Sequence, residues 1–210
     1  MTTTSYTDHA GRVERRLQEV DRDGAPAKVA TISRTYPTTV EDLWEAVTTA
    51  ERLERWFATV EGDLRLGGRY SVVGNAEGTV ETCEPPRRFT ATWEFGGQTS
   101  WIEVQVDDDP EGARFTLVHT AHVPDEFWQQ YGPGATGVGW DLALLGLTLH
   151  LEHPDFARPD PESFTTTGEG KSFVEAASAA WGEAAVAAGE PEEAARAAAQ
   201  RTTAFYTGTA

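Results

Sequence analysis

The stretch that decides the fold is RYSVVGNAEGTVETCEPPRRFTATWEFGGQTSWIEVQVDDDPEGARFTLVHTAH, residues 69–122. Apolar and polar side chains alternate there in short segments, which is the period of a strand with one buried face. Clusters of Gly, Pro, Asn and Asp separate the segments and supply the backbone conformations that hairpin turns need. The pattern predicts an antiparallel meander with strands at Arg69–Val73, Thr79–Glu84, Phe89–Phe95, Ser100–Val106 and Arg114–His122.

Helical patterns flank the meander. A β-branched and aromatic strand, Val29–Tyr36, precedes two short helices, and an aromatic helical turn follows at Phe127–Tyr131. Gly137–Glu152 then carries apolar residues at helical spacing over an unusually broad face. Only a curved sheet is large enough to cover that face. We therefore predict an α+β fold, a curved antiparallel sheet around a long helix, over residues 27–152.

The two ends of the chain differ from this domain. Residues 1–26 are polar, which predicts a partly disordered N-terminal segment. Residues 153–170 are expected to be a linker, and the alanine-rich residues 171–207 to be a helical hairpin that turns at Gly189 and Pro191. The hairpin is too poor in large apolar groups for a core of its own. It should bury Phe173, Trp181, Phe205 and Tyr206 against the domain or in a homodimer.

Charge and cysteine content limit the class of protein. The chain of 210 residues has 17 Lys and Arg against 34 Asp and Glu, a net charge of −17. Such a charge disfavours nucleic acid and membrane surfaces as partners. Cys83 is the single cysteine and the first thirty residues lack the apolar run of a secretory signal, so a cytoplasmic location is expected.

No local motif identifies a catalytic centre, a cofactor or a metal site. GPGATG, residues 132–137, matches a dinucleotide-binding glycine pattern, but no parallel strand precedes it. His119 and His122 lie three apart on a predicted strand and so point to opposite faces. His150 and His153 share a helix face beside Pro154, which predicts an exposed polar surface. We therefore predict no catalytic residue, no cofactor and no metal ligand.

Aromatic density is the remaining signal. Large rings fall on strands and helices that would converge between the sheet and the long helix, where they either fill a core or line a small-molecule pocket. His119, singly, is a pocket residue or a hydrogen-bonded core histidine. The residues predicted to line such a pocket are Trp93, Trp101, His119, Phe127, Trp128, Tyr131, Trp140, Leu144 and Arg69.

The order of elements is that of the helix-grip fold, and several short motifs add a family resemblance. LWEAVT (residues 43–48), WF (56–57), GGRY (67–70), PPRRF (85–89) and TWEF (92–95) resemble the START-like SRPBCC superfamily. Within it they resemble the branch named for the activator of the Hsp90 ATPase. The resemblance covers about Ala27 to Leu151.

The resemblance implies an apolar cavity between the sheet and the long helix. Many relatives bind lipids, polyketides or other hydrophobic molecules there, which makes binding of a hydrophobic or aromatic small molecule the leading functional prediction. Two alternatives stay open: a cyclase- or hydrolase-like enzyme that uses the same cavity, and a stress-related, cochaperone-like interaction module. Residues 1–26 are too short for the partner-binding domain of the eukaryotic cochaperones, so chaperone activation is not expected.

Overall fold

The computed structural model describes residues 5–152 and 160–209. The chain divides into two compact units. The sheet unit comprises residues 33–121 and 146–152, and the terminal unit comprises residues 5–32, 122–145 and 160–209. Strand β2 (Ala25–Tyr36) and helix α5 (Gly134–Glu152) belong partly to each.

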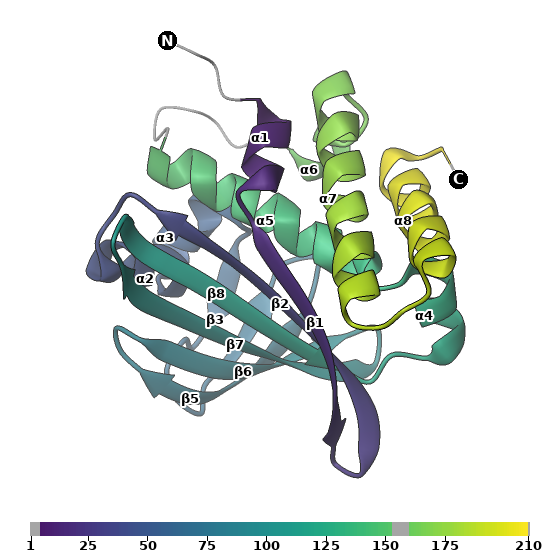
Figure 1. Ribbon diagram of the computed structural model, residues 1–210. Coiled ribbons are helices and arrows are strands. Elements are labelled where there is room, and N and C mark those ends of the chain that lie inside the picture. The colour runs from purple at the N-terminus through teal and green to yellow at the C-terminus, as the bar shows by residue number, and fades with distance from the viewer. Residues whose placement is uncertain (1–4, 153–159, 210) are drawn as a thin grey trace. The chain divides into compact units, whose positions relative to one another are not determined.

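Eight strands form one curled, antiparallel sheet, and the α+β helix-grip prediction is confirmed (Figure 1). Their order is β1-β2-β8-β7-β6-β5-β4-β3. The predicted meander is present, with boundaries that move by at most a few residues. The strands besides β2 are β1 (Glu14–Arg22), β3 (Val60–Gly62), β4 (Arg69–Val72), β5 (Glu77–Glu84), β6 (Arg88–Phe95), β7 (Gln98–Asp109) and β8 (Gly112–Ala121).

Side chains on the central strands alternate between two faces. On β7 and β8 every second residue is buried, and Val104 and Leu117 are direct cross-strand partners on the buried side. We call the side of the sheet that carries Val104 and Leu117 the inner face. The opposite side, which we call the outer face, carries Glu103, Asp107 and Arg114 of the same strands. This alternation is the period of two that the sequence predicts.

Helices α2 (Val40–Thr48) and α3 (Ala50–Trp56) cover one end of the inner face (Figure 1). The Thr39 side chain caps α2 by accepting a hydrogen bond from the Asp42 backbone N–H. The Trp44 ring meets the edge of the Phe89 ring, with centroids 6.2 Å apart, and Phe89 pairs with Val104 in the sheet. The buried side of α2 therefore packs, through Trp44, on the inner face of the sheet.

The last two turns of α5 also lie in the sheet unit. Thr148, which is fully buried, forms a side-chain hydrogen bond with Tyr36 at the end of β2. Arg34, two residues earlier on the same face of β2, forms an ion pair with Glu152 at 2.9 Å. These two contacts attach the end of α5 to β2 of the sheet.

The terminal unit corrects the prediction for the N-terminal segment and for part of the predicted linker. Residues 6–11 form α1 and residues 14–22 form β1, where the sequence predicts a partly disordered segment. A buried ion pair connects β1 to α5, since Arg15 binds Asp141. Within the predicted linker, α6 covers Pro161–Phe164 and α7 begins at Gly168, while residues 153–159 lie outside the described part of the chain.

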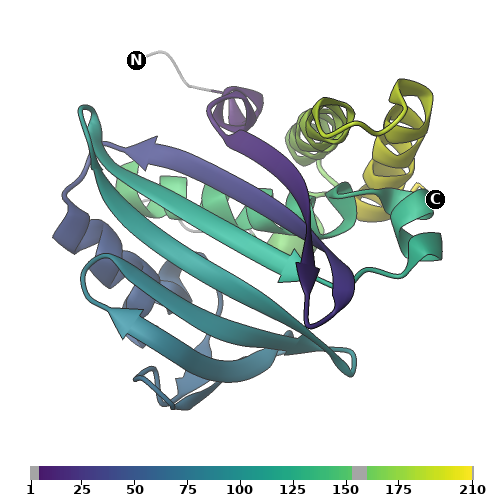
Figure 2. The ribbon, with the colours of Figure 1, turned by 60° about the horizontal axis from the view of Figure 1, so that its bottom comes forward.

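The C-terminal helical hairpin is present as α7 (Gly168–Ala187) and α8 (Glu192–Thr207), which lie side by side (Figure 2). Helix α4 (Asp125–Tyr131) contacts α8. Phe173 and Trp181 are buried, as predicted, whereas Phe205 is 57% exposed in the single chain, so its burial in a homodimer stays a prediction. The Phe205 ring packs against the Tyr131 and Tyr206 rings.

Candidate functional site

The strand register brings Trp93 and His119 to the same face of the sheet. His119 of β8 lies opposite Ile102 of β7, and Ile102 lies opposite Ala91 of β6. Trp93, two residues after Ala91, therefore shares the inner face with His119 and lies opposite Ser100. The alternation places two of the predicted pocket residues together.

A hydrogen-bonded chain links these residues. The Ser100 hydroxyl donates to the Trp93 carbonyl oxygen at 3.0 Å, and His119 Nε2 lies 2.8 Å from the same hydroxyl oxygen. A serine has one hydroxyl proton, so Ser100 accepts from His119 and Nε2 carries the ring proton. In this arrangement His119 does not act as a base on Ser100, and the pair is a hydrogen-bonding group and not a nucleophile with its base.

His119 is uncharged at neutral pH. Its side chain lies in the apolar inner face, and the residue is only 8% exposed. Burial disfavours the charged ring and lowers the pKa of His119 to about 4. The inner face thus presents a polar but uncharged group at this point.

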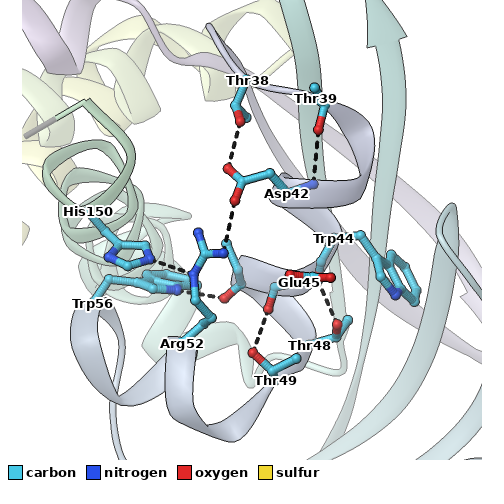
Figure 3. Close-up of polar contacts among 11 residues, drawn as sticks. Thr38, Thr39, Asp42, Trp44, Glu45, Thr48, Thr49, Arg52, Trp56 and His150 are labelled. Atoms are coloured by element: carbon cyan, nitrogen blue, oxygen red, sulfur yellow. Dashed lines mark hydrogen bonds and ion pairs between the residues drawn. The ribbon is translucent and has the colours of Figure 1, made fainter. Parts of the chain in front are cut away.

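Aromatic rings lie beside this pair. Phe57, at the end of α3, has its ring centroid 6.5 Å from that of Trp93, and 5.4 Å from that of Trp56. Trp56 is fixed by donation from its indole N–H to the Ala46 carbonyl at 2.8 Å, so α2 and α3 hold the rings in place (Figure 3). Trp93 and Phe57 are both half-buried. The aromatic rings of Trp93 and Phe57 therefore lie next to the uncharged, hydrogen-bonded Ser100–His119 pair.

Two of the predicted pocket residues lie on the other face. Trp101 pairs with Thr92 and Thr120, so its side chain points away from the inner face. Arg69 neighbours the buried Tyr70, and its guanidinium forms exposed ion pairs with Glu94 at 2.9 Å and Glu77 at 3.0 Å. Within the sheet unit, the structure does not bring Trp101 or Arg69 to the His119 pair.

A second polar cluster joins α2, α3 and the end of α5 (Figure 3). Arg52 donates from Nε to His150 Nε2 at 2.9 Å and from Nη1 to Asp42 at 2.9 Å. The Thr38 hydroxyl donates to the other Asp42 oxygen at 2.6 Å. This corrects the interpretation of His150 as an exposed polar residue, because its ring is half-buried and accepts from Arg52. His153 lies outside the described residues.

The protonation states of this cluster follow from its contacts. Burial alone would raise the pKa of Asp42, but hydrogen bonds from Thr38 and Arg52 and the Arg52 charge outweigh it and hold that pKa below its usual range. Burial and the charges of Arg52 and Arg55 lower the pKa of His150. The cluster is therefore a charged Asp–Arg pair with a neutral histidine, suited to holding three helices together. No sequence signal links Arg52 to His150, since 98 residues separate them.

The family assignment rests on the residues that build this part of the molecule. A sequence model described as activator of Hsp90 ATPase homolog 1-like protein matches residues 37–152, more than half of the chain. The chain belongs to this family. The match begins just before α2 and ends with α5, so it includes both the inner-face pair and the Arg52 cluster.

Solved structures extend this likeness. The crystal structure of CalU16 from Micromonospora echinospora is 31% identical, with a TM-score of 0.58 over 68% of this chain and 88% of that one. The solution NMR structure of CalU16 is 26% identical, with a TM-score of 0.62 over 94% of each chain, and so includes residues beyond 37–152. DynU16, from the dynemicin biosynthetic locus, shares the fold at 21% identity, with a TM-score of 0.54 over 60% of this chain and 48% of that one. No protein with a curated description matches the chain.

In this Hsp90-activator-like chain, the other predicted pocket residues belong to the terminal unit. The α4 rings contact that unit's own elements: the Lys28 ammonium lies 4.5 Å from the Trp128 ring, and Trp128 donates to Glu190 at 2.8 Å. Phe127 packs on Tyr131, which packs on Phe205. Trp140 and Leu144 lie on the first half of α5, half-buried and buried. Their part in a pocket stays a prediction.

Other chemistry has little structural support in the described residues of this family member. No three His, Cys, Asp or Glu side chains among residues 5–152 and 160–209 are placed to bind a metal ion together. Cys83, on β5, is half-buried and has no cysteine to pair with. Within the same ranges, none of the helices is long and apolar enough to cross a membrane.

Proposed function

We propose that this protein binds an uncharged, largely aromatic small molecule on the inner face of the sheet unit. The observation that carries the proposal is the juxtaposition of half-buried Trp93 and Phe57 with the uncharged Ser100–His119 pair. Rings supply apolar contact area, and a few placed polar groups fix orientation, which is the usual composition of a small-molecule site.

The charge pattern of the sheet favours a neutral ligand. On the inner face between Tyr70 and His119 the central strands present apolar residues, such as Val80, Ala91 and Ile102, and no cation. The charged side chains of Glu94, Glu103 and Arg114 on these strands lie on the outer face. A buried carboxylate or phosphate with no cation to pair with would be strongly penalised.

The one inner-face cation of the sheet unit is already neutralised. Arg34 is 3% exposed and its guanidinium binds Glu152 at 2.9 Å while lying 5.2 Å from the Tyr36 ring. An acidic ligand would have to displace Glu152 and leave that carboxylate without its partner. This supports a ligand that carries a neutral polar group, such as a hydroxyl, and no carboxylate or phosphate.

A pair of ring compounds that differ in charge tests the proposal. The probes are 2-naphthol and 2-naphthoate, titrated into the full chain by isothermal calorimetry at pH 7. We expect naphthol to bind and naphthoate to bind at least about tenfold more weakly, the difference that about 1.4 kcal/mol produces. Equal affinity for the two probes, or affinity only for naphthoate, would refute a neutral site.

The chain offers a matched control for this experiment. Trp93→Leu removes an inner-face ring, and Trp101→Leu removes the same ring type from the outer face of the next strand. We expect the first variant to weaken naphthol binding by about tenfold, because a buried aromatic contact contributes roughly 1–2 kcal/mol, and the second to change it by less than about twofold. Equal losses in both variants would place the binding elsewhere.

A further inference from the structure

The α7–α8 hairpin of the terminal unit carries a groove of about 690 Å³ that the small-molecule proposal does not use. Its floor is made of small residues. Ala179 and Gly182 come from α7 and Ala199 from α8, and a Cβ added at Gly182 would lie 3.3 Å from the Ala199 Cβ. The two helices therefore approach closely and leave a shallow apolar trough between them.

One end of the groove exposes an apolar side chain. Val186, one turn after Gly182, is 39% exposed and lines the groove. A valine in this place, next to the exposed Ala179 and Ala187, gives an apolar strip along the outer side of α7. An apolar groove is one kind of surface into which an amphipathic helix can lay its apolar face.

Three of the four charged residues that line the groove are acidic, and the fourth is Arg196. Glu175 and Glu183 lie on α7 and line the groove, and neither pairs with a base among residues 5–152 and 160–209. Glu192 on α8 is paired with Arg196 at 2.5 Å, one turn away. Glu175 and Glu183 are eight residues apart, which places them about 12 Å apart along the helix axis.

From these features we infer that the groove binds a basic amphipathic helix of a partner protein. Small or aliphatic side chains of that helix would fill the trough, and two Lys or Arg residues seven or eight positions apart would meet Glu175 and Glu183. This inference is independent of the proposed small-molecule function, since the groove lies within the terminal unit and uses none of the inner-face residues.

Charge disfavours a second copy of this chain as the occupant. A second copy of this chain would bring the same hairpin, whose residues 168–207 contain six glutamates against three basic residues. Glu175 and Glu183 of two copies would then face carboxylates, and like charges held together at an interface are unfavourable. A basic partner turns the same two carboxylates into attractive contacts.

The test uses a synthetic helical peptide and the full chain. The probe is a capped, fluorescein-labelled peptide of about four turns, with alanine and leucine along one face and two lysines seven residues apart at its edges. A shuffled peptide of the same composition lacks the amphipathic order. Fluorescence anisotropy measures both. We expect the ordered peptide to bind at least about tenfold more tightly than the shuffled one.

Variants then locate the site. Ala179 is exposed, and arginine is a good helix former, so Ala179→Arg should leave the helix intact. The variant should abolish binding of the ordered peptide, because the arginine side chain fills the trough. Glu175→Gln with Glu183→Gln should weaken binding about two- to tenfold, the range for two exposed ion pairs. The matched control is Glu169→Gln with Glu193→Gln, which removes the same charge outside the groove and should leave the affinity unchanged.

Three outcomes would overturn the inference. Equal binding of the shuffled peptide, or an equal loss in the control pair, would show a general attraction to an acidic protein. The third is found by sedimentation of the full chain without peptide. A dimer that Ala179→Arg converts to a monomer would show that a second copy occupies the groove. Binding of the ordered peptide that only the groove variants weaken, by a monomeric chain, supports it.

Discussion

Acidification should destabilise this protein through His119 before its carboxylates titrate. The native ring has a pKa of about 4, whereas an unfolded histidine has one near 6.5. Above pH 7 the His119 ring is neutral in both the folded and the unfolded state, and its contribution to the free energy of unfolding has its full value. As the pH falls below 6.5 the unfolded chain binds a proton that the folded chain does not, so the free energy of unfolding falls.

The magnitude follows from that window. Each pH unit between the two pKa values costs about 1.4 kcal/mol, so the loss is about 2 kcal/mol between pH 7 and pH 5 and about 3 kcal/mol when pH 4 is reached. The measurement stops at pH 5 because protonation of Asp and Glu side chains adds to the change below it. For a domain of ordinary stability, 2 kcal/mol is a large fraction of the total.

The assay is urea unfolding of the wild type and of His119→Gln at pH 7, 6 and 5. Glutamine keeps an N–H that can donate to Ser100 but does not titrate. The wild type should lose about 2 kcal/mol more than the variant over this range. His150→Gln serves as a comparison and should remove a smaller part of the pH dependence, because that ring is only half-buried. If the difference in free energy of unfolding between the wild type and His119→Gln stays constant from pH 7 to pH 5, His119 is not a buried, neutral histidine with a lowered pKa, and the reasoning is refuted.

Two further predictions concern the terminal unit, and urea unfolding measures both. Gly137→Ala should destabilise by about 1–3 kcal/mol, because its Cβ would lie 2.3 Å from the Trp181 ring, whereas Gly168→Ala, with no atom within 4 Å, should be neutral or slightly stabilising. An equal effect of the two would contradict the close packing. Asp141→Asn should cost about 3–5 kcal/mol by leaving the Arg15 charge buried without its partner, and adding Arg15→Met should recover much of that loss. No recovery in the double variant would argue against an uncompensated charge.

Local patterns were sufficient to predict the sheet and the helices of the central domain. Alternation with a period of two, interrupted by Gly96 and Gly97 and similar turns, carries both the strand type and its boundaries. The N-terminal elements could not be found in this way. Arg15 looks like a surface residue in the sequence, and its partner Asp141 lies 126 residues away in an apolar helix. Nothing local to either residue signals a buried pair.

The candidate site could be predicted only in part, for a geometric reason. Alternation shows that neighbouring residues point to opposite faces but not which face is the inner one, because that depends on the register between strands. Trp93 and Trp101 were therefore equivalent in the sequence, and pairing separates them. Arg69 follows the same logic, since its neighbour Tyr70 takes the inner position.

Asp141 is a buried acidic residue in the apolar helix α5, and its contacts explain why it is there. Its carboxylate is buried, and it accepts from Arg15 and from the Trp181 indole N–H at 2.7 Å. Burial raises the pKa of Asp141 more than these contacts lower it. Three segments distant in sequence meet at this one carboxylate: β1, α5 and α7. The terminal unit therefore depends on a complete polar network, because removing one partner would leave a buried charge without compensation.

The glycine-rich segment at residues 132–137 now has a physical explanation that does not involve a nucleotide. A dinucleotide motif uses glycine because a bare backbone lets a phosphate approach. In α5 the same absence of a Cβ admits protein side chains: the Trp181 ring lies against Gly137, and Thr202 lies 3.0 Å from the position of a Cβ at Gly134. The Tyr206 hydroxyl oxygen lies 3.2 Å from the position of a Cβ at Gly139. Because α7 and α8 both contact α5 through these glycines, the hairpin that carries the groove is part of the folded terminal unit and not an appendage.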